Sequence, residues 1–333
     1  MVQLQNLPRG TIKLAELAIP YIIEQSVDLL EALFGPALEV VSSSLRGCLI
    51  AAPSHRFIVA DYANIEGRVT AWLAGESWKL HAFRDFDNGS GPDLYKLAYS
   101  RSFGIPVADV TDDQRQVGKV MELALGFQGG TGALQAMARN YGMSIAAGEA
   151  EKLKEAWRGV HPAVVALWRS MESAVFRAVA SPGSIETAAA GRIKFHVKGG
   201  FLWMILPSGR PLAYASPSIV RREMPWGAQK DVVIYHGIDS HNRQWSEQTG
   251  YGGLWTENAV QAIARDIMAA AMLRLEAAGY PLVCSVHDEL IAEVPEGTGS
   301  LAEYEDMMVI TPEWACGCPV AAKGWAGTRY RKG

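Results

Sequence analysis

The sequence predicts an α+β fold, in which an antiparallel sheet is combined with a mainly helical part. Three observations support this prediction. A run of β-branched and aromatic residues at 56–62 (RFIVADY) indicates a buried strand. Strongly periodic patterns at 111–128 and 256–278 indicate helices. Short alternating runs between 186 and 235, separated by Pro-Ser-Gly and Pro-Trp-Gly, indicate a small antiparallel part.

The composition is typical of a globular protein of about two domains. The chain has 333 residues, of which 49% are hydrophobic and 20% charged, and its net charge is −4. This composition excludes a disordered or collagen-like chain. No apolar run reaches the roughly 18 residues of a membrane span, and the first ten residues do not resemble a signal peptide. We therefore expect a cytoplasmic protein with no membrane partner. The negative charge argues only mildly against a nucleic-acid partner, because basic residues can line a groove locally.

The first half of the chain contains two well-marked helices beside the buried strand. The helix expected at 64–74 directly follows the strand, so Asp61 lies at the strand end. A loop at 88–92 then precedes a short helix-like piece at 93–99. The helix at 111–128 begins with the capping-box pair Thr111 and Gln114. We expect it to end at the glycines that follow residue 128.

The second half of the chain adds the antiparallel part, a long helix and a hairpin. The helical pattern at 256–278 ends at a glycine. In the segment 281–295, apolar residues alternate on either side of His287-Asp288, and a proline bounds each end. The simplest interpretation is a β-hairpin with this dipeptide at its turn.

Asp61 and Asp288 are therefore both expected at strand ends, where neighbouring strands of one sheet would bring them together. Two adjacent carboxylates repel each other unless cations neutralise them. A pair of divalent cations does so, and a two-metal site clamps both oxygens of an in-line phosphoryl displacement. Magnesium suits such a site, because it takes one or two carboxylates and completes its shell with water and phosphate. The alternative is that each aspartate is only a turn residue.

One face of the predicted helix at 111–128 carries a second candidate pattern. Four residues spaced by four drift only about 40° per step along this face. They are Arg115, Lys119, Leu123 and Phe127. Two cations suit a triphosphate, and an aromatic ring suits a base. The alternative is a solvated basic edge beside a core aromatic residue.

Three segments occur in the order and approximate spacing of motifs A, B and C of family A DNA polymerases. They are Asp61–Glu66 (DYANIE), Arg115–Phe127, and Val286–Glu289 (VHDE). Further matches are Leu4–Pro8 (LQNLP), Pro207–Arg210 (PSGR) and Glu257–Asp266. The chain resembles a phage-type member of that family along essentially all its length, and three motifs in order are a specific signal.

The resemblance implies a right-hand polymerase palm with an antiparallel sheet and mainly helical fingers. Residues 1–75 and 186–333 would form the palm, and residues 76–185 the fingers. The palm would then carry the hairpin at 281–295, and the fingers the helix at 111–128.

The resemblance also implies roles for the candidate residues. Asp61 and Asp288 would be the catalytic carboxylates that bind two Mg²⁺ ions, for which Mn²⁺ is a substitute, and Glu289 would be an auxiliary acid. Arg115 and Lys119 would bind the phosphates of the incoming deoxynucleoside triphosphate. Lys119 would also be a candidate proton donor to the leaving group.

Four further residues match positions that select the sugar or contact DNA. Glu66 matches the steric gate, which fills the space that a ribose 2′-hydroxyl would need. Gln261 matches a residue near the primer-template minor groove, and His287 one near the primer terminus. Arg265 lies one turn beyond Gln261 in the same motif and is expected to contact DNA.

Three positions depart from the family pattern. Phe127 keeps the aromatic ring of the usual tyrosine but has no hydroxyl to donate a hydrogen bond. Leu123 stands where the family often has an aromatic residue, which leaves selectivity against dideoxynucleotides open. Tyr95 stands where some relatives have a phosphate-contacting histidine, so one phosphate contact is lost or replaced by a hydroxyl.

The resemblance begins inside the palm, so the exonuclease domain and the thumb are expected to be absent. We therefore expect template-directed DNA synthesis on a primer-template without proofreading. Three explanations stay open: a fragment or mis-assigned start, one half of a split polymerase whose N-terminal half is a separate chain, or a reduced polymerase of low processivity. A processivity factor is a further candidate partner. Other classes are a single-subunit RNA polymerase, which Glu66 disfavours, a non-catalytic DNA-binding module, and a two-metal nuclease.

Overall fold

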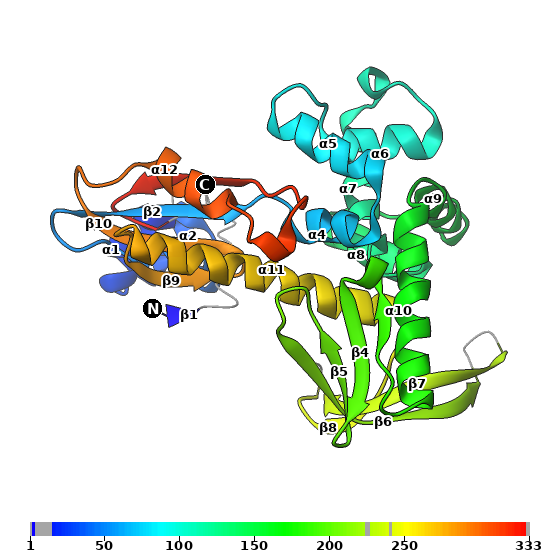
Figure 1. Cartoon of the computed structure of the whole chain (residues 1–333). Helices are drawn as coiled ribbons and strands as arrows, with labels where there is room; N and C mark the ends of the chain where they lie inside the picture. Colours follow the sequence, from blue (N-terminus) through cyan, green and yellow to red (C-terminus); the bar gives the residue numbers. More distant parts are fainter. Residues whose placement is uncertain (1, 4–14, 224–226, 240–241, 331–333) are drawn as a thin grey trace. The chain divides into compact units, whose positions relative to one another are not determined.

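The computed structural model describes residues 2–3, 15–223, 227–239 and 242–330 (Figure 1). The chain forms two compact units, and each is described by itself. The first unit comprises Met1–Ile65, Ile267–Pro312 and Val320–Gly333, and the second comprises Glu66–Asp266 and Glu313–Pro319. The motif at Leu4–Pro8 lies outside the described residues. Among the helices that are described, none is long and apolar enough to cross a membrane.

The first unit is built on a five-stranded sheet with the strand order β1-β9-β10-β2-β11. The strands are β1 (Val2–Gln3), β2 (His55–Tyr62), β9 (Leu282–Val286), β10 (Glu289–Pro295) and β11 (Ala322–Gly327). Strand β2 pairs antiparallel with both β10 and β11. Four consecutive residues of β2, Phe57 to Ala60, are all buried, which explains the continuous apolar run. The predicted strand at 56–62 and the predicted hairpin at 281–295 are confirmed.

Gly324 allows β11 to lie closely against β2. A Cβ atom at this position would stand 2.0 Å from the carbonyl oxygen of Val59 and 2.7 Å from the Cβ atom of Ala60. Both distances are far below van der Waals contact. A glycine is therefore required for β11 to pair at this register.

Short helices complete the first unit. They are η1 (Ala15–Ala18), α1 (Ile19–Ile23), α2 (Val27–Phe34), α3 (Ala37–Ser44), η2 (Arg46–Cys48) and α12 (Leu301–Val309). A small cluster of Ala18, Leu30 and Val40 holds the first helices together. Large apolar side chains nevertheless remain exposed on α2 and α3, among them Leu29, Leu33 and Leu38.

The second unit contains most of the helices. They are α4 (Ile65–Ala74), α5 (Ser77–Asp87), α6 (Leu94–Phe103), η3 (Val107–Asp109), α7 (Asp112–Leu125), α8 (Thr131–Asn140), α9 (Ala147–Val160), α10 (Pro162–Ala180) and η5 (Glu313–Ala315). The predicted helix at 64–74 is confirmed. Helix α5 was not predicted, and α6 extends beyond the short piece expected at 93–99.

Helix α7 begins as predicted and ends earlier than predicted. The Thr111 hydroxyl accepts from the backbone N–H of Gln114 at 3.2 Å, and the Gln114 side chain accepts from the backbone N–H of Thr111 at 2.9 Å. The helix stops at Leu125 rather than at residue 128. Gln128 adopts a φ of 64°, and a Cβ atom on Gly129 would stand 1.9 Å from the Ala124 carbonyl oxygen, so the chain turns back against the helix end.

The second unit also contains a six-stranded antiparallel sheet whose strands follow the chain order. The strands are β3 (Glu186–Ala188), β4 (Ile193–Lys198), β5 (Phe201–Ile205), β6 (Pro211–Glu223), β7 (Gln229–Ile238) and β8 (Trp245–Thr249), with η4 (Ala189–Gly191) after β3. Helix α10 packs along this sheet (Figure 1). The predicted antiparallel part is confirmed and extends further along the chain than residue 235.

Helix α11 (Gly252–Ala277) is the long helix predicted at 256–278, with one more turn at its start. The α+β class, with antiparallel sheet and a mainly helical part, is thus confirmed. The expected palm and fingers ranges stay a prediction. The two compact units divide the chain by its internal contacts, and these contacts do not say which segment is palm and which is fingers. The units group the sheet at 186–249 with the helices that precede it.

Candidate active site

Three carboxylate-bearing residues meet in the first unit, at the end of β2 and the turn between β9 and β10. Glu289 lies directly opposite Asp61 in the pairing of β10 with β2. The backbone N–H of Tyr62 donates to the carbonyl oxygen of Asp288 at 3.2 Å, which joins the turn to the strand end. His287 takes a left-handed φ of 54° and makes the tight turn. The backbone at Asp288 therefore lies beside the end of β2, as expected from adjacent strand ends, while the meeting of the two carboxylates and their roles stay predictions.

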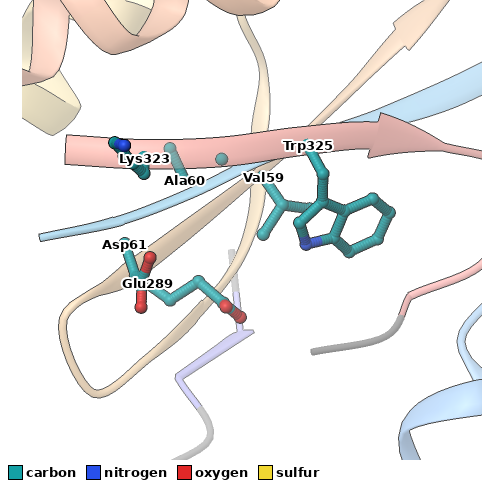
Figure 2. Close-up of a pocket in the computed structure, with 7 residues that line it drawn as sticks. Val59, Ala60, Asp61, Glu289, Lys323 and Trp325 are labelled. Carbon is teal, nitrogen blue, oxygen red and sulfur yellow. The ribbon is translucent and has the colours of Figure 1, made fainter. Parts of the chain in front are cut away.

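A cavity of about 180 Å³ opens beside Asp61. Figure 2 shows its lining, with the side chains of Asp61 and Glu289 next to each other. Lys323 lies opposite Asp61 on β11, so Asp61 has a carboxylate on one neighbouring strand and an ammonium group on the other. Lys323 was not among the residues that the sequence indicated. Its position depends on the pairing of β11, for which the sequence offers no local signal.

Glu289 is hydrogen-bonded to Tyr330, and Tyr330 is hydrogen-bonded to Arg46; the sequence indicated neither of these two residues. The Glu289 side chain is only 7% exposed, and the Tyr330 hydroxyl donates to its Oε1 atom. Nη1 of Arg46 in turn donates to the Tyr330 hydroxyl oxygen at 2.6 Å. Burial and this hydrogen bond to Glu289 raise the pKa of Tyr330, so the hydroxyl stays a proton donor.

The carboxylates suit magnesium in chemistry without forming a ready-made cage. Within the described residues, no group of three or more histidine, cysteine, aspartate or glutamate side chains is arranged to hold a metal ion. Magnesium does not need such a group, because one or two carboxylates and substrate phosphates complete its shell. Asp61 and Asp288 are both half-buried, and Asp61 lines the cavity, so two carboxylates are available for such a shell.

Helix α7 of the second unit presents the predicted cations on its outer face. Nη2 of Arg115 pairs with the Asp93 carboxylate at 2.8 Å, and its guanidinium lies 5.3 Å from the ring centre of Tyr95. Burial acts to raise the pKa of Asp93, but hydrogen bonds from Arg115 and from two backbone N–H groups outweigh it and lower the pKa. Nζ of Lys119 lies 4.6 Å from the ring centre of Tyr141. Each cation therefore rests on a tyrosine ring.

Leu123 and Phe127, the other two residues predicted on this helical face, lie in different places. Leu123 is on the same helix and is 44% exposed. Phe127 lies beyond the helix end, so its expected place on the helical face was wrong. The reason is the turn described above, which begins at Gly126. Phe127 instead contacts the start of α11, where a Cβ atom on Gly253 would stand 2.2 Å from the Phe127 carbonyl oxygen.

The inner face of α7 is anchored by a buried charge cluster. Glu122 forms an ion pair with Lys79, accepts from the Trp157 indole N–H at 2.8 Å, and lies 3.2 Å from Nε2 of His161. Burial acts to raise the pKa of Glu122, but the charges of Lys79 and His161 outweigh it and hold the pKa well below its usual range. The cluster fixes α7 against α5, α9 and the start of α10.

The remaining predicted residues lie on α4, α11 and the hairpin turn. Glu66 is exposed in the first turn of α4, and its carbonyl oxygen accepts from the Thr70 hydroxyl at 2.7 Å. Gln261 is exposed on α11, and its amide lies 3.4 Å from the Glu257 carboxylate. Nη1 of Arg265 is buried without a hydrogen-bond partner among the described residues. His287 is exposed at the turn.

Two of the sequence matches contact each other within the second unit. Nε of Arg210, from the Pro-Ser-Gly-Arg turn, pairs with the Asp266 carboxylate of α11 at 2.6 Å. The Ser208 hydroxyl bonds to the same carboxylate at 2.5 Å. The turn between β5 and β6 is thereby fixed to the helix that carries Gln261 and Arg265.

Comparison with known proteins identifies relatives of one kind. The family described as DNA polymerase family A matches residues 36–331. The chain is 37% identical to the DNA polymerase of Bacillus phage SP02 over 334 aligned residues, which cover all of this chain and 50% of the relative. It is 26% identical to DNA polymerase I of Mycobacterium tuberculosis over 72% of this chain and 21% of that protein. The chain thus spans at most half the length of these relatives.

A solved structure shares the fold. The polymerase domain of Pol1 from M. smegmatis, solved in complex with a DNA primer-template and dNTP, superposes with a TM-score of 0.53 at 20% identity. The match covers 87% of this chain and 42% of the other. At this identity the likeness concerns the fold.

Proposed function

Since the chain belongs to DNA polymerase family A, we propose that it adds deoxynucleotides to a primer 3′-hydroxyl as a DNA template directs. The observation that carries the proposal is that Asp61 and Glu289 face each other across two neighbouring strands and line a cavity, with Asp288 in the adjoining turn. Two facing carboxylates are costly in a fold unless cations are to be bound there.

We propose that Asp61 and Asp288 hold two Mg²⁺ ions, and that Mn²⁺ is a substitute. When bound, these ions would neutralise the carboxylates, lower the pKa of the primer 3′-hydroxyl and balance the charge of the leaving pyrophosphate. Glu289 acts beside them as an auxiliary carboxylate. In the transfer itself, the 3′-oxygen bonds to the α-phosphorus, the bond to the β-phosphate oxygen breaks, and the hydroxyl proton passes to solvent.

We assign the outer face of α7 to the incoming nucleotide. Arg115 and Lys119 bind its phosphates, and Lys119 is the candidate proton donor to pyrophosphate. Tyr95 supports Arg115 from below, which is a different role from a direct phosphate contact. Leu123 on this face and Phe127 just beyond the helix end supply apolar surface near the base, and Glu66 excludes a ribose 2′-hydroxyl. Gln261, Arg265 and His287 are assigned to the primer-template DNA.

The proposed activity is synthesis without proofreading, because every segment that resembles a family motif is a polymerase motif. The proposed setting is the cytoplasm of a bacterial or phage-infected cell. A single-subunit RNA polymerase is the weaker assignment, because the acidic side chain of Glu66 suits discrimination against ribonucleotides.

A second candidate is a polymerase that needs a partner polypeptide, such as a separate N-terminal polymerase chain or a processivity factor. One observation favours it. Large apolar side chains are exposed along the short helices between residues 17 and 50, where a solitary domain would place polar ones. Leu38 is 87% exposed and Ile23 is 75% exposed.

Primer extension tests the proposal directly. The purified chain is incubated with a primed DNA template, Mg²⁺ and deoxynucleoside triphosphates, in parallel with an Asp61→Ala variant. Extension by the wild type alone supports the proposed activity. A folded wild type without activity excludes autonomous synthesis, and recovery on addition of a thumb-bearing polypeptide would support the second candidate.

A further inference from the structure

We propose that Tyr330 and Arg46 are positioning residues, which fix the carboxylate of Glu289 beside Asp61. The inference rests on the proposed function and adds two residues to it. Neither residue lies in a segment that resembles a family motif. Both come from parts of the chain remote from the hairpin, Arg46 from η2 and Tyr330 from the segment after β11.

A continuous line of hydrogen bonds connects the three residues. Nη1 of Arg46 donates to the Tyr330 hydroxyl oxygen at 2.6 Å, and the Tyr330 hydroxyl donates to Oε1 of Glu289. The guanidinium is also 5.3 Å from the centre of the Tyr330 ring. A hydroxyl that accepts from a cation is a better donor, so the bond to the carboxylate is charge-assisted.

The backbone around Tyr330 fixes its ring before any substrate binds. The N–H of Tyr330 donates to the Leu49 carbonyl oxygen at 2.9 Å, and the N–H of Ala51 donates to the Thr328 carbonyl oxygen at 2.9 Å. The ring is fully buried in a cluster that includes Phe57, Val59 and Ile291. The buried packing of the ring restricts where the hydroxyl can lie.

The arrangement answers a physical need of Glu289. Its carboxylate is almost fully buried and lies directly across the strand pair from Asp61, another carboxylate. Like charges opposite each other on a sheet repel, and a buried carboxylate needs hydrogen bonds. The Tyr330 hydroxyl supplies such a bond and ties the Oε1 atom to one place. The orientation of Glu289 toward the site is thereby set by Tyr330, with Arg46 behind it.

A double-mutant cycle tests this positioning role. The Tyr330→Phe variant removes one oxygen atom and keeps the ring. We expect it to lower kcat for nucleotide incorporation about tenfold, the effect of losing one hydrogen bond to a charged group, while KM for the nucleotide changes less than twofold. Glu289→Gln should lower kcat at least as much. The double variant should be no slower than Glu289→Gln alone, because Tyr330 acts through Glu289.

Tyr304→Phe provides the matched control. Tyr304 is also fully buried in the first unit, and its hydroxyl has no hydrogen-bond partner among the described residues. Removing this hydroxyl should leave kcat within twofold of wild type. Thermal unfolding of the wild type, the two single variants and the double variant gives a readout independent of activity. The effects of the Tyr330 and Glu289 substitutions on the free energy of unfolding should also be non-additive.

The outcomes separate the inference from the proposed function. If the wild type extends primers and the two losses of kcat multiply in the double variant, the positioning role is overturned and the polymerase assignment stands. Loss of kcat in Tyr304→Phe equal to that in Tyr330→Phe would also overturn it, since any buried hydroxyl would then do the same. A folded wild type that stays inactive even with a thumb-bearing polypeptide overturns the proposed function, and the inference with it, even when unfolding shows coupling.

Discussion

At the scale of single residues, the site is a row of charges across three adjacent strands. Glu289, Asp61 and Lys323 are direct neighbours in the sheet and lie on one face. The carboxylate pair disfavours the fold, and the cross-strand ammonium group offsets part of that cost. Such a row is difficult to explain as turn or surface chemistry alone. This row of charges is the reason, from single residues, to regard this end of the strands as functional.

The first residue-scale prediction concerns Asp288. Asp288→Ala should abolish nucleotide incorporation, because one of the two carboxylates assigned to magnesium is removed, while the fold persists since the side chain lies at a turn. Steady-state primer extension and circular dichroism measure the two effects. Asp306→Ala, an exposed aspartate on α12 of the same unit, is the control and should extend primers normally. Substantial synthesis by the Asp288 variant would remove it from the metal site.

The second residue-scale prediction concerns Lys119. Lys119→Ala should raise KM for the nucleotide about tenfold and lower kcat, because a cation preorganised on the Tyr141 ring is lost from phosphate binding. Single-nucleotide incorporation kinetics measure both constants. Lys152→Ala on the exposed side of α9 carries the same change of charge and should have no effect. Equal kinetics for the Lys119 variant and wild type would take α7 out of nucleotide binding.

At the scale of elements, β11 completes the environment of Asp61, and its approach depends on one glycine. The position opposite Ala60 has room for hydrogen only, because any Cβ atom would meet the β2 backbone. Lys323 and Trp325 flank this glycine and line the cavity. The register that puts Lys323 opposite Asp61 therefore requires the absence of a side chain at residue 324.

Gly324→Ala should consequently destabilise the protein by about 2 kcal/mol and displace β11, as overpacking of a tight contact does. The free energy of unfolding from urea denaturation tests this. Gly148→Ala is the control, because a Cβ atom there meets nothing within 4 Å and the residue is in helix α9. The control should be unchanged or more stable by about 0.5 kcal/mol. Equal stability of the Gly324 variant and wild type would contradict the required close approach.

Helix α7 depends on Glu122, and this gives a prediction about pH. The pKa of Glu122 is lowered in the folded protein, so its contribution to stability is present above the ordinary carboxyl pKa and is lost as the pH falls through the folded value. Glu122→Gln should cost about 3 kcal/mol at pH 7, because Lys79 then lacks its buried partner. The difference from wild type should shrink below about pH 4.

Urea denaturation at several pH values measures this difference. Glu149→Gln, an exposed glutamate at the start of α9, provides the control and should match wild type at each pH. A Glu122→Gln deficit that stays constant from pH 7 to pH 3 would contradict the assigned ion pair.

The elements also show where sequence patterns suffice and where they fail. Strand β2, the hairpin and the start of α7 follow from local signals: an apolar run, a turn dipeptide between two prolines, and a capping box. The end of α7 does not, since its glycines permit the turn but do not fix where it begins. Helix α5 has no clear periodic signal in the sequence, because its buried Lys79 breaks the polar–apolar pattern.

At the scale of the whole molecule, the motif order indicates the family, but pairing between remote segments builds the site. Asp61 and Asp288 could be predicted as site residues from the sequence, because each lies at the end of a strand with a clear local signal. The sequence could not predict three other residues of the site, because pairing between segments far apart in the chain brings each of them there. They are Arg46, Lys323 and Tyr330. The grouping of the second sheet with the helices is likewise tertiary and leaves no local trace.

The order of strands in the first sheet has a consequence for synthesis on the ribosome. Strand β2 ends at Tyr62, whereas its neighbours β10 and β11 begin at Glu289 and Ala322. At about 5–20 residues per second, this largely buried strand waits roughly 10–45 s before its first antiparallel partner is translated. During that interval both of its edges can pair with other chains. Slower translation or loss of holdase chaperones should therefore reduce the yield of soluble protein before any change in its final stability.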